Sequence, residues 1–438
     1  MPQDSFDVIV VGAGLAGSAC ALTLARNGVR VCLCERGTRP GEKSLSGMIL
    51  YGRPLEALIP FFWKEAPVER PIVRRRFSVL SKDSEIALDL RFEEFNHPPY
   101  NYTFSVLRSK FDRWFAKQAE DTGATILSGA LVDDLLWDGE KVAGVAIRGG
   151  TSLKADVVVS CEGTNAFLVE KAGLRDRFPH RKIAVGVKEV LAMPREVIQE
   201  RFGLEGDEGI AMEFFGQSVR GLVGSAFLYT NQDSISVGLS CSVESLIAGK
   251  IPPAELLAQF KQHPAVRRWV RGAERLEYGA QMIPEGGFYG IPLLIRDGFM
   301  VCGSAAGFVG GVFYHEGSSM ALTSGRLAAE TILDAHKQGD YSARALEPYV
   351  QRLKQSPVLK DLYSQRRLSA WCHENPWFFR NYPELAIELL RDYFTVSEKT
   401  KGEIHRGIAR KFRRRVGWLR GLWHFWHFWR FKRVMFGK

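Results

Sequence analysis

The sequence predicts an α/β protein that combines a dinucleotide-binding Rossmann domain, a β-rich insertion and a helical C-terminal region. A glycine-rich turn lies between two apolar strand patterns near the start of the chain, and a second strand-to-glycine turn lies at residues 297–307. Strand patterns fill much of the sequence between these turns, and helical patterns fill the last hundred residues. The nucleotide-binding domain is therefore expected in separate pieces with the β-rich insertion between them.

The first turn carries the signal for a dinucleotide. An apolar run at residues 8–11 predicts a buried parallel strand, a helical pattern follows at 15–28, and a second apolar strand at 29–34 ends at Glu35. The turn itself contains Gly12, Gly14 and Gly17. Glycines let the backbone approach a pyrophosphate, and the helix N-terminus offers free N–H groups. Glu35 lies about 20 residues after the glycines, where an acidic side chain binds ribose hydroxyls.

The remaining elements follow from apolar periodicity. Strand patterns lie at 75–80, 86–90, 124–127, 130–136, 142–147, 156–160, 183–240 and 279–300, and helical patterns at 107–122, 253–272 and 318–336. The last hundred residues read as helices punctuated by Pro357, Pro376 and Pro383. The expected segments are 1–74, 107–175 and 296–337 for the nucleotide-binding domain, 75–106 and 176–295 for the insertion, 338–404 for the helical region and 405–438 for a basic amphipathic tail.

Composition predicts a globular protein with one unusual end. Hydrophobic residues make up 46% and charged residues 25% of the chain, which is typical of soluble domains. Residues 401–438 hold twelve lysines and arginines but one acid, Glu403, so nearly all of the net charge of +10 belongs to this tail. The strand beginning at Asp7 leaves no room for a signal peptide, and no apolar run is long enough for a spanning helix.

The cysteines predict neither a disulfide framework nor a metal site. Seven cysteines are scattered along the chain without a CxxC pair or the spacing of iron–sulfur ligands. Cys32 and Cys34 point to the same face of a predicted strand, which packing explains. This usage is typical of the reducing cytoplasm.

The second glycine turn favours FAD over NAD. The segment DGFMVCGSAAG at 297–307 has the form of the late motif by which large flavoproteins approach the ribityl phosphate and the pyrimidine edge of the flavin. Arg108 heads a predicted helix from which it could reach the pyrophosphate, although a solvated arginine at a helix start is the alternative. Val132 on a strand beside the adenine and the turn at 161–163 complete the predicted FAD site.

The tail predicts an interfacial helix. At 100° per residue its large apolar side chains share one arc, flanked by basic clusters at 413–415 and 430–433. The tryptophans of this arc are Trp418, Trp423, Trp426 and Trp429. Aromatic and cationic residues in this arrangement favour an anionic membrane surface. A partner protein is the main alternative, and nucleic acid is disfavoured because no nucleic-acid-binding module accompanies the tail.

The ordered motifs GAGLAGSACA, KSLSG, LRSKFDRW, SCEGTNA and GSAAGF resemble the glutathione-reductase-type flavoproteins of the p-hydroxybenzoate hydroxylase superfamily. Longer strings, among them APVERP, IAVGVKEV, FLYTNQDSISVGLSC, MIPEGG and NYPELAIELLRDYFTV, are similar to the FixC family. This resemblance implies FAD, a quinone acceptor in the inserted domain and electrons from the α and β subunits of an electron-transfer flavoprotein. The implied cofactor-binding residues are Gly12, Ala13, Gly14, Leu15, Ala16, Gly17, Glu35, Arg36, Lys43, Ser46, Gly47, Arg108, Val132, Glu162, Gly163, Gly303, Ser304, Ala306 and Gly307.

Two departures from the family pattern refine this expectation. Many superfamily members have Gly-Asp where this chain has Gly303-Ser304, so that contact passes to a hydroxyl. Larger single-chain relatives carry a cysteine-ligated iron–sulfur cluster, and its cysteines have no counterpart in this sequence. The cluster is therefore expected in a separate, small ferredoxin-like subunit. The predicted protein is peripheral on the inner face of the cell membrane and forms the high-potential exit branch of an electron-bifurcating complex.

Candidate catalytic residues are few. Tyr314 and His315 follow the late glycine turn and are candidate proton donors for quinone reduction, with a structural histidine as the equal alternative. Other readings of the whole chain are an FAD-dependent polyprenyl (geranylgeranyl) reductase, an aromatic monooxygenase and a non-catalytic flavoprotein subunit that anchors a complex to the membrane. Reduction of a short-chain quinone would support the quinone oxidoreductase, and loss of prenyl unsaturation would support the polyprenyl reductase.

Overall fold

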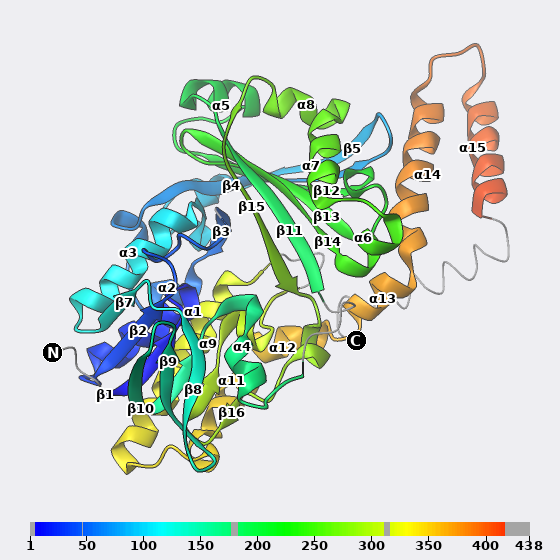
Figure 1. The fold of residues 1–438 in the computed structure, drawn as a ribbon. Helices are drawn as coiled ribbons and strands as arrows, with labels where there is room; N and C mark the ends of the chain where they lie inside the picture. Colours follow the sequence, from blue (N-terminus) through cyan, green and yellow to red (C-terminus); the bar gives the residue numbers. More distant parts are fainter. Residues whose placement is uncertain (1–4, 46, 177–182, 311–315, 417–438) are drawn as a thin grey trace.

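Two β-sheets and their helices make up the part of the chain that the structure describes, residues 5–45, 47–176, 183–310 and 316–416 of a computed structural model. The first sheet lies in the lower half of Figure 1, and the second, mainly green, crosses the upper half. The helical C-terminal end projects to one side as an orange and red hairpin. The predicted α/β class with a β-rich second unit is therefore confirmed.

The first sheet has the parallel core that the nucleotide-binding domain requires. Its path runs β16 (Ile295–Arg296), β17 (Phe299–Val301), β10 (Thr151–Ser160), β1 (Ser5–Val11), β2 (Val31–Glu35) and β7 (Thr125–Ser128), with β9 (Lys141–Ile147) on β10 and β8 (Val132–Asp138) on β9. The central strands pair in parallel, and Val8 lies between Val31 and Val157. These strands are apolar runs, as expected of parallel strands that are buried on both faces.

Three long helices of this unit pack closely together. α1 (Leu15–Arg26) contacts α3 (Arg108–Asp121) and α9 (Ser318–Gln338), and it also contacts β1 and β2. A Cβ atom on Gly325 of α9 would lie 2.0 Å from the carbonyl oxygen of Ala16, so the two helices meet backbone to backbone. The short helices α2 (Arg53–Glu56) and α4 (Phe167–Lys171) complete this unit.

The second sheet is mostly antiparallel. Its path runs β15 (Glu274–Pro284), β11 (Ile183–Ala192), β14 (Ser234–Ser242), β13 (Gly224–Thr230), β12 (Gly209–Gly216), β4 (Val68–Leu80), β6 (Thr103–Val106) and β3 (Met48–Tyr51), with β5 (Glu85–Arg91) on β4. β4 pairs with β12 in parallel and belongs to the same sheet over its whole length. The expected boundary between residues 74 and 75, where the first nucleotide-binding segment gives way to the insertion, falls inside β4. The division of the chain into domain segments stays a prediction.

Side chains of the second sheet alternate between two environments, as the pleat of a strand dictates. One face packs on α5 (Arg195–Phe202), α6 (Val243–Gly249), α7 (Pro253–Gln262) and α8 (Pro264–Val270), seen at the top of Figure 1. Met212, Leu228 and Val237 belong to this buried core. The opposite face carries a row of directly paired residues that runs Glu213, Phe227, Gly238 and Lys188.

The C-terminal helices divide into two groups. α10 (Ala343–Leu346), α11 (Pro348–Gln355) and α12 (Pro357–Ser364) contact α9 or the strands beside it. α13 (Leu368–Glu374) packs on Val223, α14 (Pro376–Phe394) contacts β12 and β4, and α15 (Lys401–Val416) packs on α14 at the side of the molecule (Figure 1). Pro357 and Pro376 begin helices, as predicted, because the first helical N–H needs no partner. Pro383 instead lies inside α14, where it packs against Gly216 at the end of β12.

No helix within the described residues is long and apolar enough to cross a membrane. α15 ends at Val416 with Arg413, Arg414 and Arg415 in its last turn. The predicted tryptophan-bearing tail helix, with Trp418, Trp423, Trp426 and Trp429, lies outside the described residues.

Candidate functional site

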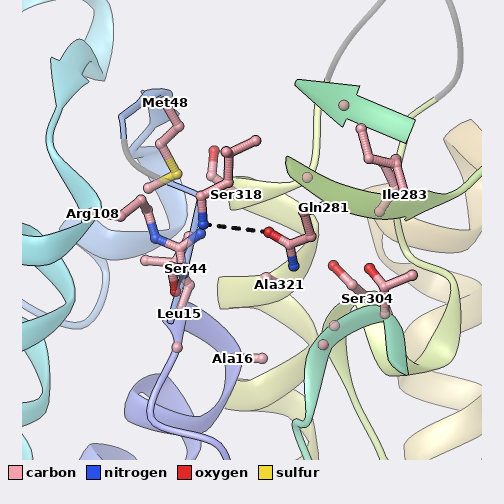
Figure 2. A pocket seen from close by; sticks show the side chains of 18 of the residues that line it. Leu15, Ala16, Ser44, Met48, Arg108, Gln281, Ile283, Ser304, Ser318 and Ala321 are labelled. Carbon is pink, nitrogen blue, oxygen red and sulfur yellow. Dashed lines mark hydrogen bonds between the residues drawn. The ribbon is translucent and has the colours of Figure 1, made fainter. Parts of the chain in front are cut away.

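One cavity of about 480 Å³ lies where the strand ends of the first sheet meet one face of the second. Its wall joins the turn before α1, the segment around residues 43–49, the turn after β17, the start of α9 and the row of paired residues on the second sheet. Figure 2 shows Leu15 and Ala16 at the start of α1 facing the same space as Gln281 and Ile283 of β15. The backbone N–H of Leu45 donates to Oε1 of Gln281 at 3.4 Å and links the two sides.

The first glycine turn is shaped by close backbone contacts. Gly12 has a φ of +103°, and a Cβ atom there would lie 2.4 Å from the carbonyl oxygen of Cys161. A Cβ atom on Gly17 would lie 1.9 Å from the carbonyl oxygen of Gly12, so α1 sits tightly on β1. α1 has no side-chain cap at Gly14, and this N-terminus lies on the cavity wall. Uncapped N–H groups and the positive end of the helix dipole favour an anion at this point.

Glu35 ends β2 at the cavity with its carboxylate fixed by backbone donors. Oε2 accepts from the N–H of Ala13 at 3.1 Å, and Oε1 accepts from the N–H of Gly37 at 2.7 Å. The side chain is buried, yet it lines the cavity beside Arg36 and Val132. A carboxylate held in this way retains acceptor positions for a pair of hydroxyl groups.

Arg108 is held on the cavity wall by an acid that the sequence reasoning missed. Nε and Nη2 donate to the two carboxylate oxygens of Asp112 at 2.7 and 2.5 Å, and Nη2 donates to Oγ of Ser44 at 3.3 Å. Burial acts to lower the pKa of Arg108, but the charge and hydrogen bonds of Asp112 outweigh it and leave the pKa raised. The guanidinium is thus not a solvated group at a helix start, and it lies 3.5 Å from the Cβ position of Gly14.

The late glycine turn reaches the cavity from the other side. Gly303 and Ser304 lie in a 3₁₀ turn, η8 (Gly303–Ala306), directly after β17, and both line the cavity. α9 then starts at Ser318 on the same wall, and Oγ of Ser318 accepts from the N–H of Tyr51 at 3.0 Å. Two uncapped helix N-termini, those of α1 and α9, therefore open onto one space.

Glu162 closes the wall beneath the first turn. Oγ of Ser160 donates to Oε2 of Glu162 at 2.7 Å, and the N–H of Leu168 donates to the same carboxylate at 3.2 Å. Burial raises the pKa of Glu162 despite these hydrogen bonds. Gly163 follows it on the cavity wall.

The structure brings most of the sequence-predicted residues to this one cavity. The predicted residues on its wall are Gly12, Gly14, Leu15, Ala16, Glu35, Arg36, Lys43, Gly47, Arg108, Val132, Glu162, Gly163, Gly303 and Ser304. Four others lie behind the wall, where they pack or shape turns: Ala13, Gly17, Ala306 and Gly307. Ser46 and the candidate proton donors Tyr314 and His315 lie outside the described residues.

The second sheet adds ionisable residues that the sequence reasoning did not single out. Lys188 on β11 and Glu213 on β12 both line the cavity and lie in the row described above. Oε2 of Glu213 is buried without a hydrogen-bond partner among the described residues, and burial raises the pKa of Glu213 to about 7, with Arg75 acting in the opposite direction. A charged residue inside the apolar run IAVGVKEV was the available signal for Lys188.

This wall fits a flavin dinucleotide. Its nucleotide end is made of backbone N–H groups, one fixed carboxylate and one fixed guanidinium, which match a pyrophosphate and a ribose. Gly12, Gly14 and Gly303 keep the wall free of side chains where the ligand would approach most closely. The described residues contain no group of three or more His, Cys, Asp or Glu arranged to bind a metal ion.

Comparison with known proteins gives the same picture along the whole chain. Residues 7–206 match the FAD-dependent oxidoreductase family, and residues 368–433 match the C-terminal domain of the ETF-QO/FixC family. The chain is 41% identical over 422 residues to the protein FixC of Azorhizobium caulinodans, which covers 95% of this chain and 97% of that protein. It is 40% identical over 409 residues to a probable electron transfer flavoprotein-quinone oxidoreductase of Escherichia coli, covering 93% and 95% respectively.

Solved structures show the same fold at lower identity. A geranylgeranyl bacteriochlorophyll reductase-like protein of Thermoplasma acidophilum superposes with a TM-score of 0.71 at 19% identity, covering 96% of this chain and 99% of that chain. A flavin-dependent brominase superposes with a TM-score of 0.62 at 19% identity, covering 94% and 99%. At this identity the likeness concerns the fold alone.

Proposed function

Because the chain belongs to the family of FixC proteins and electron-transfer-flavoprotein–quinone oxidoreductases, we propose that it passes electrons from an electron-transfer flavoprotein to a quinone. The chain is an FAD-dependent oxidoreductase. The observation that supports the proposed acceptor is the cavity itself, which runs without interruption from the nucleotide-binding turn to the polar and aromatic face of the second sheet. A planar acceptor on that face would share the cavity with the flavin end of the cofactor.

In this proposal three side chains and two helix N-termini bind FAD. Glu35 accepts hydrogen bonds from the adenosine ribose, Arg108 and the N-terminus of α1 bind the pyrophosphate, and Ser304 and the N-terminus of α9 bind the ribityl and flavin end. When bound, FAD accepts electrons from one partner and returns them to another. Asp112 holds the Arg108 guanidinium in the direction of Gly14, which removes the entropy cost of ordering a long side chain at binding.

The acceptor face of the second sheet supplies shape and polarity. The rings of Phe227 and Tyr229 lie 5.9 Å apart at an interplanar angle of 18°, which offers a flat apolar surface for a quinone ring. Glu213 lies on one side of these rings, on the adjacent strand β12, and Lys188 lies on the other side, on β11, with β14 between β11 and β13. A quinone has two carbonyl oxygens, so hydrogen-bond donors on either side of a flat surface match its chemistry.

We propose that a separate, ferredoxin-like subunit brings the electrons from the electron-transfer flavoprotein. All seven cysteines are buried, and the described residues hold no cluster of metal ligands, so an iron–sulfur centre on the route belongs to another chain. In an electron-bifurcating complex this chain would form the high-potential exit to quinone.

We propose that the basic C-terminal end holds the protein on an anionic membrane surface. α15 carries seven lysines and arginines and one acid, Glu403. Each basic group close to such a surface contributes about 1 kcal/mol at low ionic strength. The aromatic tail residues that follow, Trp418 among them, would enter the headgroup region.

The test is reconstitution with partners. The protein is purified with the proteins that co-purify, its FAD content is measured after denaturation, and reduction of a short-chain quinone is followed with reduced electron-transfer flavoprotein as the donor. Quinone reduction that requires the flavoprotein supports the proposal. Absence of quinone reduction in the reconstituted complex, with reduction of prenyl double bonds instead, would replace it by polyprenyl reduction.

A further inference from the structure

Lys188 carries a buried amine on the cavity wall, and the proposed function assigns no proton transfer to it. Lys188 is 3% exposed and lies on β11 with its side chain at the cavity. Nζ donates to the carbonyl oxygen of Gly47 and shares a hydrogen bond with the hydroxyl of Tyr229. Both partners are uncharged, so they orient the amine without neutralising it.

No carboxylate pairs with Lys188 among the described residues. The ionisable groups that face it are Tyr229 on β13, Arg108 on α3 and Glu277 on β15. The next residue, Glu189, points to the other face of the strand and is neutralised there by Lys261 and Arg275. A lysine buried without a counter-ion is costly to the fold, which points to a use for it.

Two glycines make room for the Lys188 side chain. A Cβ atom on Gly47 would lie 2.8 Å from Nζ of Lys188 and 2.7 Å from the hydroxyl oxygen of Tyr229. A Cβ atom on Gly238 would lie 2.6 Å from Cζ of Phe227 and 3.1 Å from Cβ of Lys188. Nζ lies 4.8 Å from the Tyr229 ring centroid and 5.7 Å from that of Phe227, so the amine borders the flat acceptor surface.

We propose that Lys188 is a proton-carrying residue of this cavity, which binds a proton when electrons enter the site and releases it when they leave for the acceptor. This inference rests on the proposed function, because it requires FAD to bring the electrons. Burial lowers the pKa of Lys188 well below its usual value, while Glu277 acts to raise it and Arg108 to lower it further. The empty site therefore favours the neutral amine, and negative charge in the cavity favours the ammonium.

The atoms and electrons balance with a single lysine proton. Reduction of a quinone to a quinol takes two electrons and two protons. Both electrons and one of the protons would come from the reduced cofactor, FAD. The second proton leaves Lys188: an N–H bond of the ammonium breaks, an O–H bond forms on the quinol oxygen, and the neutral amine remains. The amine binds its next proton from solvent when the next electron pair reaches the FAD.

The test is the pH dependence of the midpoint potential of the bound FAD, read from its absorbance in the purified, FAD-loaded protein. Each proton taken up with two electrons lowers the potential by about 30 mV for every tenfold fall in proton concentration. We expect about 60 mV per pH unit in the wild type, and about 30 mV per pH unit in Lys188→Met, which has lost one proton site. Lys261→Met is the matched control outside the cavity, and we expect it to keep the wild-type slope.

Lys188→Arg separates proton transfer from structural support. Arginine keeps a positive charge but does not release a proton. We therefore expect Lys188→Arg to show the same slope of about 30 mV per pH unit as Lys188→Met, with a higher midpoint potential of the bound FAD than in Lys188→Met. A wild-type slope in either variant with FAD bound would overturn the proposal, and Lys188→Arg decides alone if Lys188→Met does not retain FAD. The measurement uses no quinone and no electron-transfer flavoprotein, so it can succeed where the proposed function fails. If the slopes are as expected but no electrons pass from electron-transfer flavoprotein to quinone in the reconstituted complex, the proposed function is rejected and the proton-carrying role of Lys188 stands.

Discussion

Replacing Glu213 by glutamine should make the protein more stable at neutral and alkaline pH. The carboxyl lies in the cavity wall with Oε2 buried and without a partner among the described residues. Burial disfavours its ionised form and raises its pKa from an ordinary 4.5 to about 7. Glutamine keeps the shape of the side chain and never ionises, so the variant escapes the cost of a buried charge.

The size of the effect follows from the pKa shift. A folded pKa above the unfolded pKa means that the folded state retains the proton longer, so the wild type loses stability as the pH rises from 4.5 to about 7. Each pH unit in this interval costs about 1.4 kcal/mol, and the total reaches about 3 kcal/mol above pH 7. Glu213→Gln should therefore match the wild type at pH 4.5 and exceed its stability increasingly up to pH 7.

Thermal unfolding of the FAD-loaded protein between pH 5 and pH 8 measures this difference. We expect the melting temperature of Glu213→Gln to rise relative to that of the wild type by a few degrees across this range. Glu140→Gln is the matched control, because the Glu140 side chain is 97% exposed and its charge costs little. An identical pH dependence in Glu213→Gln and the wild type would refute the reasoning and show that water reaches this carboxyl.

Three further predictions concern the nucleotide end and the C-terminal end. Gly12→Ala should lower the affinity for FAD at least about tenfold, measured by flavin fluorescence, since its Cβ would overlap a backbone carbonyl; Gly28→Ala also places alanine at a positive φ but meets nothing within 4 Å, and it should bind FAD normally. Asp112→Asn should release Arg108 and weaken FAD binding about tenfold at low salt, and unchanged affinity would show that Arg108 needs no anchor. Replacing the arginines at 413–415 with glutamine should reduce binding to anionic vesicles in a flotation assay and leave FAD content unchanged, whereas unchanged flotation would favour a protein partner for this end.

The nucleotide end could be predicted from the sequence because its chemistry is backbone chemistry. Gly12, Gly17 and Glu35 occupy fixed positions in one continuous strand–turn–helix–strand unit, so their spacing alone indicates the site. Asp112 was missed although it lies four residues after Arg108, because an i,i+4 pair on a helix normally signals an exposed ion pair. Only the packing of α3 against α1 shows that this pair is buried at the cavity.

The acceptor end could not be predicted in the same way, because it is assembled across strands that are far apart in the chain. Glu213, Phe227 and Lys188 come from three strands, and their order on the sheet depends on register that no local pattern reveals. Alternation does predict which residues share a face of one strand, and a charged residue among apolar neighbours marks the exception. Lys188 and Glu189 show where this prediction stops. Alternation places their side chains on opposite faces of β11, but only the register of the sheet shows that Lys188 faces the cavity and that Glu189 forms its ion pair outside it.

The two ends of the cavity therefore differ in which substitutions they tolerate. Under the proposed function, backbone N–H groups bind the nucleotide end of FAD, and such contacts depend on the glycines and on Glu35 more than on other side chains. The acceptor face depends on side chains that can each be exchanged on an intact strand, so one fold is able to serve different acceptors. Among the described residues Lys188 has no counter-ion and Oε2 of Glu213 has no hydrogen-bond partner, and burial of both groups disfavours their charged forms. Exchanging them for apolar residues should therefore raise stability, and under the proposed function it should also abolish quinone reduction.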